Sequence, residues 1–199
     1  MKSLMNTKKL VTLSVLAALT VILQLLSMFI KFGPFVATLA LIPLIIGAIC
    51  YGPGAGCLLG FIMGAVILFT DSQAFWVINP FYTILICLSK TAIAGLVSGL
   101  VFKGLRRFNF NLAVVVATIV APIVNTGLFA SLALLCFYDT LTSWAGGTNT
   151  LNYLFLTMIG VNFLIEFGLN SFLSPAFIYL LRNLNNRYDL GLELNKESI

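Results

Sequence analysis

The chain has 199 residues, of which 60% are hydrophobic and only 9% are charged, and its formal net charge is +5. This leaves too little polar surface to cover a soluble globule of that size, so a soluble fold is excluded and an integral membrane protein is predicted. Nine of the eleven lysines and arginines lie beside the ends of apolar runs, a pattern typical of membrane orientation and not of a polybasic patch, so nucleic acid is not the expected partner.

The first apolar run, at residues 10–30, follows a short basic stretch. Such a start is also typical of a secretory signal, but this run exceeds the usual hydrophobic core of a signal and lacks a clear small-x-small cleavage site. We therefore expect a retained first helix over 9–30. Its small residues Ser14, Ala17 and Ala18 favour close approach of another helix, because Ser14 and Ala18 stand four apart.

Two short helices are predicted next. Residues 31–35 read KFGPF and break the first helix, since proline removes a backbone donor and restricts the residue before it. Residues 36–70 are apolar almost throughout, about twice what one crossing needs, and the Gly/Pro-rich segment 51–56 interrupts them. We expect helices over 36–51 and 54–70, joined by a tight turn on the inner side.

The fourth and fifth helices each carry an isolated polar side chain inside an apolar span. The fourth is expected over 81–102, with Lys90 well inside it. The fifth is expected over 112–137, with Asn125 near its centre and a proline one turn before it. Polar groups at such depth are candidates for function, because an apolar span gains nothing from them unless they face a partner or water.

The sixth apolar run, 153–182, has three polar side chains in its middle. Asn162, Glu166 and Asn170 are spaced four apart, so they fall on one helical face. A carboxylate at bilayer depth costs roughly 2.5–3.5 kcal/mol unless it faces a partner or water. We therefore expect this polar stripe to point into the bundle, where Lys90 is the other ionisable group at comparable depth.

Together these runs predict an all-α integral membrane protein. It is expected to form a single membrane domain over 1–199, a six-transmembrane-helix bundle with a charged tail at 183–199. With both the N- and C-termini in the cytoplasm, Lys31 lies outside and Lys90 lies in the membrane, while the other basic residues lie inside, as the positive-inside rule requires. Those inside are Lys2, Lys8, Lys9, Lys103, Arg106, Arg107, Arg182, Arg187 and Lys196. The cell (plasma) membrane is the expected location.

The polar centre has three open interpretations. Counted from the outer ends of their helices, Lys90 and Glu166 lie roughly 14 and 20 Å deep, so they are either close together or a turn or more apart. They can form a structural ion pair that fixes helix packing. Alternatively, they can line a cavity with Asn125, Asn162 and Asn170 and bind a polar ligand. A proton relay is the third interpretation, which the absence of histidine makes less natural.

The expected outer loops are rich in aromatic side chains and poor in charge. Aromatic belts occur at membrane interfaces in general, and this explains most of them. Trp76 and Trp144 are also candidates for a lid, because a flexible loop of low charge can fold over a bound organic molecule and exclude water.

Enzymatic motifs are missing from the sequence. There is no histidine, and neither a GxSxG nor a P-loop GxxxxGK[ST] motif occurs, so we expect no enzyme, no metal site and no cofactor. The four cysteines lack metal-ligand spacing and are expected to be buried small residues. Transport against a gradient therefore needs either ion coupling or a partner that hydrolyses nucleotide.

Four segments of the chain resemble a known family in their order and spacing. They are LSVLAA at 13–18, FGPFVATLALIPLIIGAICYGPGAGCLLGFIMG at 32–64, INPFYTILICLSKTAIAGLVSGL at 78–100 and VNFLIEFGLNSFLSPAFIYLL at 161–181. The chain resembles the substrate-binding S components of energy-coupling factor (ECF) vitamin transporters over residues 8–182.

The resemblance implies a subunit that captures a water-soluble vitamin or precursor outside the cell. It implies inward delivery with a transmembrane coupling subunit and two cytoplasmic ATPase subunits. It also implies docking through helix one at Ser14, Ala17 and Ala18, with Ser14 at a position where the family has alanine.

The resemblance further implies a substrate site near the outer side. A buried lysine with several amides suits an anionic, hydroxylated ligand such as pantothenate, unless Glu166 already occupies Lys90. The implied substrate-binding residues are Phe35, Trp76, Asn79, Lys90, Asn125, Trp144, Asn162 and Glu166.

Two other functions stay open at this point. One is a stand-alone proton- or ion-coupled carrier of small molecules that uses Glu166 and Lys90. The other is a membrane scaffold without a small ligand. Uptake that depends on an ion gradient indicates the carrier, whereas uptake that depends on ATPase subunits indicates an S component. A scaffold is indicated if substitution of Asn162 or Glu166 alters folding or assembly without changing any ligand affinity.

Overall fold

The computed structural model describes residues 2–29, 31–32, 35–36 and 39–188. The regular secondary structure of this part of the chain is helical apart from one two-residue antiparallel pair, β1 (Lys31–Phe32) with β2 (Phe35–Val36). The helices are α1 (Lys2–Ser27), α2 (Leu41–Tyr51), α3 (Pro53–Thr70), α4 (Gln73–Trp76), α5 (Pro80–Leu105), α6 (Phe110–Cys136), α7 (Tyr138–Trp144), α8 (Thr150–Asn152), the π-helical η1 (Tyr153–Gly160) and α9 (Val161–Tyr188).

Five of these described helices are long and apolar enough to cross a membrane. They comprise Lys9–Ser27, Pro53–Thr70, Pro80–Leu105, Phe110–Cys136 and the continuous helical stretch Thr150–Asn183. These helices confirm the predicted fold class, a helical membrane protein. The remaining predicted crossing, 36–51, corresponds to α2, which is shorter than predicted: residues 35–36 pair as β2, and the helix begins at Leu41.

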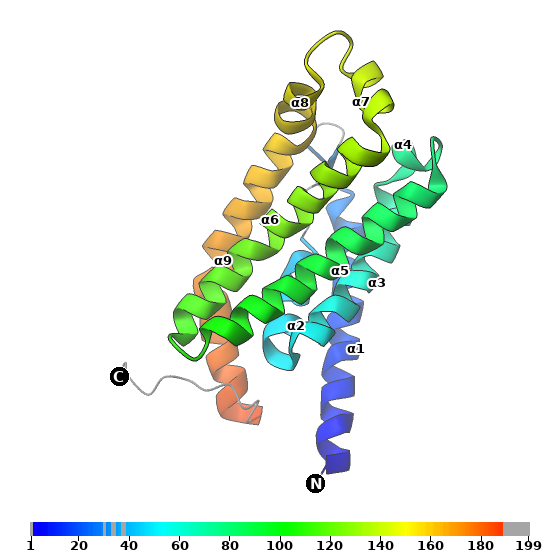
Figure 1. Cartoon of the computed structure of the whole chain (residues 1–199). Helices are drawn as coiled ribbons and strands as arrows, with labels where there is room; N and C mark the ends of the chain where they lie inside the picture. Colours follow the sequence, from blue (N-terminus) through cyan, green and yellow to red (C-terminus); the bar gives the residue numbers. More distant parts are fainter. Residues whose placement is uncertain (1, 30, 33–34, 37–38, 189–199) are drawn as a thin grey trace.

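The two ends of the bundle differ in construction (Figure 1). The short helices α4, α7 and α8 gather at one end, within the segments expected to be outer loops. The turns between α2 and α3 and between α5 and α6 lie at the other end, as does the start of α1. Segments expected to be loops at 71–80 and 138–152 are thus partly folded into helical turns.

The short helix α2 lies inside the bundle and contacts α1, α3, α5, α6 and α9. Its 11 residues span about 16 Å, roughly half the hydrocarbon thickness of a bilayer. Leu41, Leu44, Ile45 and Ala48 have no exposed surface. A helix that is apolar on all sides is stable where every side is covered, and α2 occupies that position.

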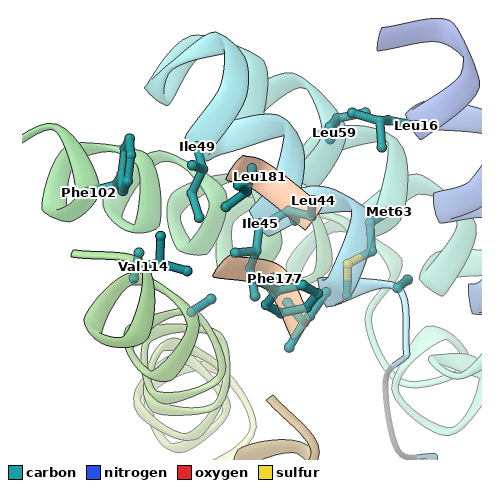
Figure 2. Close-up of a cluster of buried hydrophobic side chains, with 14 of the residues drawn as sticks. Leu16, Leu44, Ile45, Ile49, Leu59, Met63, Phe102, Val114, Phe177 and Leu181 are labelled. Atoms are coloured by element: carbon teal, nitrogen blue, oxygen red, sulfur yellow. The ribbon is translucent and has the colours of Figure 1, made fainter. Parts of the chain in front are cut away.

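The buried hydrophobic cluster around α2 joins all the long helices (Figure 2). Ile45 and Ile49 of α2 lie among side chains from α3, α5, α6 and α9 in this cluster. The labelled members are Leu16, Leu44, Ile45, Ile49, Leu59, Met63, Phe102, Val114, Phe177 and Leu181. A second buried hydrophobic cluster includes Phe75 of α4 and Phe137.

Glycines bring α3 and α5 into backbone contact. A Cβ added at Gly95 would overlap the carbonyl oxygen of Gly56, and one added at Gly60 would overlap the carbonyl of Thr91. Lipid tails are as apolar as leucine, so helices in a membrane associate through close van der Waals packing, which small residues permit. This contact fixes α5, and hence Lys90, against α3.

The ends of α1 and α2 are set by local chemistry. Ser27 ends α1: its hydroxyl donates to the Leu23 carbonyl at 2.7 Å and accepts from the Leu39 amide at 3.1 Å. Gly52 ends α2 with a φ of 92°, a left-handed conformation that glycine adopts without a Cβ penalty. Pro53 then opens α3 in its first turn, where its missing amide hydrogen is not needed.

Candidate binding site

A cavity of about 100 Å³ lies between α3, α4, α5, α6, η1 and α9. It mixes polar and aromatic walls, as small-molecule sites do. Its polar side chains come from the three long helices α5, α6 and α9 and from the residues that follow α3. They are Asp71, Ser72, Thr83, Lys90, Asn125, Thr126, Asn162 and Glu166.

The polar stripe of the last helix faces inward. Asn162, Glu166 and Asn170 are all buried, and Asn162 and Glu166 line the cavity. Asn170 lies one turn further along, and its Nδ2 donates to the Glu166 carbonyl oxygen at 2.8 Å. The spacing of four residues therefore places the carboxyl group and one amide at the same wall.

Lys90 and Glu166 line the same cavity, so the depth difference estimated from the sequence does not separate them. Lys90 is half-buried, and its Nζ lies 4.8 Å from the centroid of the Phe129 ring. Such a contact stabilises an ammonium ion by about 0.5–2 kcal/mol, and more where water is excluded. The cavity thus contains a positive group on α5 and a carboxyl group on α9.

Two amide side chains in the cavity wall have unused hydrogen-bonding capacity. Asn125 is 5% exposed and Asn162 is 9% exposed. The Oδ1 atoms of both are buried and have no hydrogen-bond partner among the described residues. A buried amide oxygen without a donor costs about 1–3 kcal/mol, so a pair of them in one cavity indicates a place for a ligand that forms hydrogen bonds.

Asp71 is a further acidic group at the cavity wall. It follows α3 directly as its C-cap residue, and its Oδ2 accepts a hydrogen bond from Gln24 Nε2 of α1 at 2.7 Å. In the sequence, Asp71 directly follows the apolar run 36–70, a position typical of a loop residue. No local signal distinguishes such a residue from an ordinary loop aspartate.

Phenylalanines form the apolar wall, and sequence analysis did not single them out. Phe75 of α4 packs against Phe129 at 6.0 Å and Phe137 at 5.0 Å between ring centroids. Phe163 of α9 completes this wall. The sequence does not show whether a phenylalanine in an apolar helix faces a cavity or lipid. These wall residues can therefore be identified only from the three-dimensional structure.

The eight predicted site residues divide into two groups. Lys90, Asn125, Asn162 and Glu166 meet at the cavity. The remaining described members are elsewhere: Trp76 is 40% exposed on α4, and Trp144 is 37% exposed on α7 with its ring 5.3 Å from that of Phe75.

Asn79 and Phe35 complete that set. Asn79 caps α5, since its side chain accepts from the Tyr82 amide at 3.3 Å. The side chain of Phe35 lies outside the described residues, and only its backbone is seen, in β2. A role in substrate binding for any of the eight stays a prediction.

The predicted docking residues lie on the outward face of α1. Ser14 and Ala18 are exposed and Ala17 is half-buried. Ser14 keeps its hydroxyl on its own helix, donating to the Leu10 carbonyl at 2.9 Å, so it presents no unsatisfied donor to a neighbour. The same face carries exposed apolar side chains, including Val15 and Ile22.

Comparison with protein families gives a match over most of the chain. The model of the ECF transporter substrate-specific component matches residues 8–178. The chain belongs to this family. The predicted resemblance is confirmed. The comparison with curated proteins finds no match.

Membership of the S-component family and the apolar helices together establish a multi-pass membrane protein that serves transport. Within an ECF transporter, the S component is the substrate-specific subunit, and it is not an enzyme by family. Membership also implies partnership with ECF coupling and ATPase subunits and with a small-molecule substrate.

Proposed function

We propose that this S component captures a water-soluble vitamin or vitamin precursor from outside the plasma membrane. A coupling subunit and two cytoplasmic ATPase subunits then deliver it inward. The observation that carries this proposal is the cavity shared by α5, α6 and α9, in which Lys90, Asn125, Asn162 and Glu166 converge against a phenylalanine wall. Apolar packing alone would not gather these polar groups, because each is costly at membrane depth.

The ligand chemistry that suits this cavity is anionic and hydroxylated, as in pantothenate. Lys90 can bind a carboxylate, since it is the ammonium group of the wall. The carboxyl groups of Asp71 and Glu166 are acceptors, so hydroxyl and amide hydrogens of the ligand can donate to them. The Asn125 and Asn162 amides provide both donors and acceptors for the centre of the molecule.

Native mass spectrometry of the detergent-purified protein, followed by a thermal-shift panel of B vitamins and their precursors, tests the proposal. We expect one vitamin to co-purify and to raise the melting temperature, because a ligand that binds only the folded state stabilises it by mass action. Absence of binding after endogenous ligand has been washed out would remove the vitamin-binding function.

We propose that α2 completes a sixth crossing and that both termini lie in the cytoplasm. The distribution of lysine and arginine supports this orientation, and the burial of α2 at the bundle centre supports its place within the membrane. Single cysteines introduced at Lys9 and Thr148 of a cysteine-free protein test it. An impermeant maleimide applied to intact cells should label position 148 and spare position 9.

A stand-alone ion-coupled carrier is the competing function, and the shared cavity of Glu166 and Lys90 is the observation that favours it. Uptake assays separate the two. Uptake by an S component stops when the ATPase subunits are deleted and persists when the proton gradient is dissipated with ATP maintained. The carrier has the opposite dependence.

A further inference from the structure

The side chain of Gln24 crosses from α1 to the cavity wall. Gln24 has no exposed surface, and its Nε2 donates to Asp71 Oδ2 at 2.7 Å. Asp71 lines the cavity, whereas Gln24 does not. The bond therefore connects α1, whose described side chains do not line the cavity, with an acidic group that does line it.

Packing alone does not explain why the buried side chain at position 24 carries an amide group. Its Oε1 is buried and has no hydrogen-bond partner in the part of the chain that the structure describes. An apolar side chain of similar length would fill the same space without leaving a buried acceptor unpaired. Its Nε2 donates to Asp71 Oδ2, so the polar chemistry of this side chain is directed at the cavity wall.

A carboxylate held in this way is well suited to ligand recognition. One hydrogen bond from Gln24 fixes the plane of the Asp71 carboxyl group but uses only part of its acceptor capacity, since a carboxylate has about four lone-pair sites. Groups that bind ligands with precision are usually held by such outer contacts.

We propose that Gln24 is a positioning residue for substrate binding: it orients Asp71 so that the carboxyl group accepts a hydrogen bond from a hydroxyl or amide hydrogen of the substrate. The inference rests on the proposed function, because it requires a ligand in this cavity. It adds a residue of α1, outside the cavity, to those that set affinity, and it assigns Asp71 a direct contact with the substrate.

The test measures equilibrium binding of radiolabelled pantothenate to the purified protein. If another B vitamin gives the largest thermal shift with the wild type, that vitamin is the probe. Gln24→Met removes the donor at nearly constant size, and we expect affinity to fall about tenfold. Thr20→Val is the matched control, because Thr20 is equally buried one turn earlier on α1 and its hydroxyl donates only within the helix, to the Leu16 carbonyl at 2.8 Å.

A double-mutant cycle distinguishes positioning from a general effect on folding. In an Asp71→Asn background, we expect Gln24→Met to change affinity by less than about twofold, since the carboxyl group that Gln24 orients is gone. Equal losses in both backgrounds, or an unchanged affinity of Gln24→Met in the wild-type background, overturn the inference.

Two further outcomes are distinguishable. If Gln24→Met does not yield monodisperse protein, Gln24→Asn takes its place, since it keeps the polarity but is one methylene too short to maintain the bond. The same loss of affinity and the same cycle are expected of it. Failure of the wild-type protein to bind any vitamin overturns the proposed function and the inference together, whereas wild-type binding with additive losses overturns the inference alone.

Discussion

The Lys90 ammonium nitrogen lies 4.8 Å from the centroid of the Phe129 ring, at the wall of the cavity. The ring face carries partial negative charge, which stabilises the ammonium ion without neutralising it. A carboxylate, in contrast, would cancel its charge. Lys90 is therefore stabilised at the cavity wall by a contact that does not itself neutralise the charge of the ammonium group.

Replacement of Lys90 by methionine tests this charge directly. We expect Lys90→Met to weaken pantothenate binding about tenfold or more, since charge-assisted hydrogen bonds contribute about 1.5–3 kcal/mol. Pantothenol, in which an alcohol replaces the carboxylate, provides the control ligand, and its affinity should change little. The measurement is isothermal titration calorimetry with both ligands. Equal losses for the two ligands would show that Lys90 acts on packing and not on a ligand charge.

Removal of the carboxyl group of Glu166 should also weaken binding. Glu166 is 5% exposed and lines the cavity, so we expect Glu166→Leu to lower vitamin affinity by more than about tenfold while the protein level holds. Leu164→Ala is the control, because Leu164 is exposed on the same helix and does not line the cavity. Affinity and expression are measured on the same preparations. An unchanged affinity of Glu166→Leu would remove Glu166 from the site.

Substitution by alanine at two glycines of α5 should have different effects on the stability of the protein. A Cβ at Gly95 would overlap the Gly56 carbonyl, so Gly95→Ala should destabilise the protein by about 1–3 kcal/mol or more through separation of α3 and α5. A Cβ at Gly104 meets no atom within 4 Å, so Gly104→Ala should be neutral or should stabilise by up to about 1 kcal/mol. Thermal unfolding in detergent measures both. Equal melting temperatures for the two variants would contradict the glycine contact.

A bulky ring on the outward face of α1 should separate binding from transport. We expect Ala18→Trp to abolish uptake in cells and to leave vitamin affinity of the isolated protein intact, because Ala18 is exposed and remote from the cavity lining. Phe172→Trp on α9 is the control for an added ring on an exposed surface. Uptake by Ala18→Trp at the wild-type rate would exclude this face of α1 as the docking surface.

The sequence predicted the polar part of the cavity better than its apolar part. A spacing of four residues placed Asn162, Glu166 and Asn170 on one face, and burial of that face follows from the cost of polar groups in lipid. Lys90 and Asn125 stood out for the same reason. Phe129 and Phe137 did not, because the same side chain is stable in lipid and in a cavity wall.

Local geometry set other limits on prediction. The π-helical turns of η1 depend on backbone hydrogen bonds shifted by one residue, which the residue pattern does not predict. Met158 and Ile159 of η1 line the cavity. The pairing of Asp71 with Gln24 joins residues far apart in sequence. Apolar composition likewise predicted a helix at 36–51 but not the β pair that precedes the shorter helix Leu41–Tyr51.

The contact between Phe75 and Trp144 joins α4 to α7, two short helices that interrupt distant outer segments. Phe75 lines the cavity and its ring contacts that of Trp144 at 5.3 Å between centroids, so α4 cannot swing away without breaking this ring contact. We therefore expect a bound molecule to leave through one concerted opening of both segments. Its dissociation should then follow a single exponential with a steep temperature dependence, and the residence time, more than the association rate, should depend on the ring at position 144.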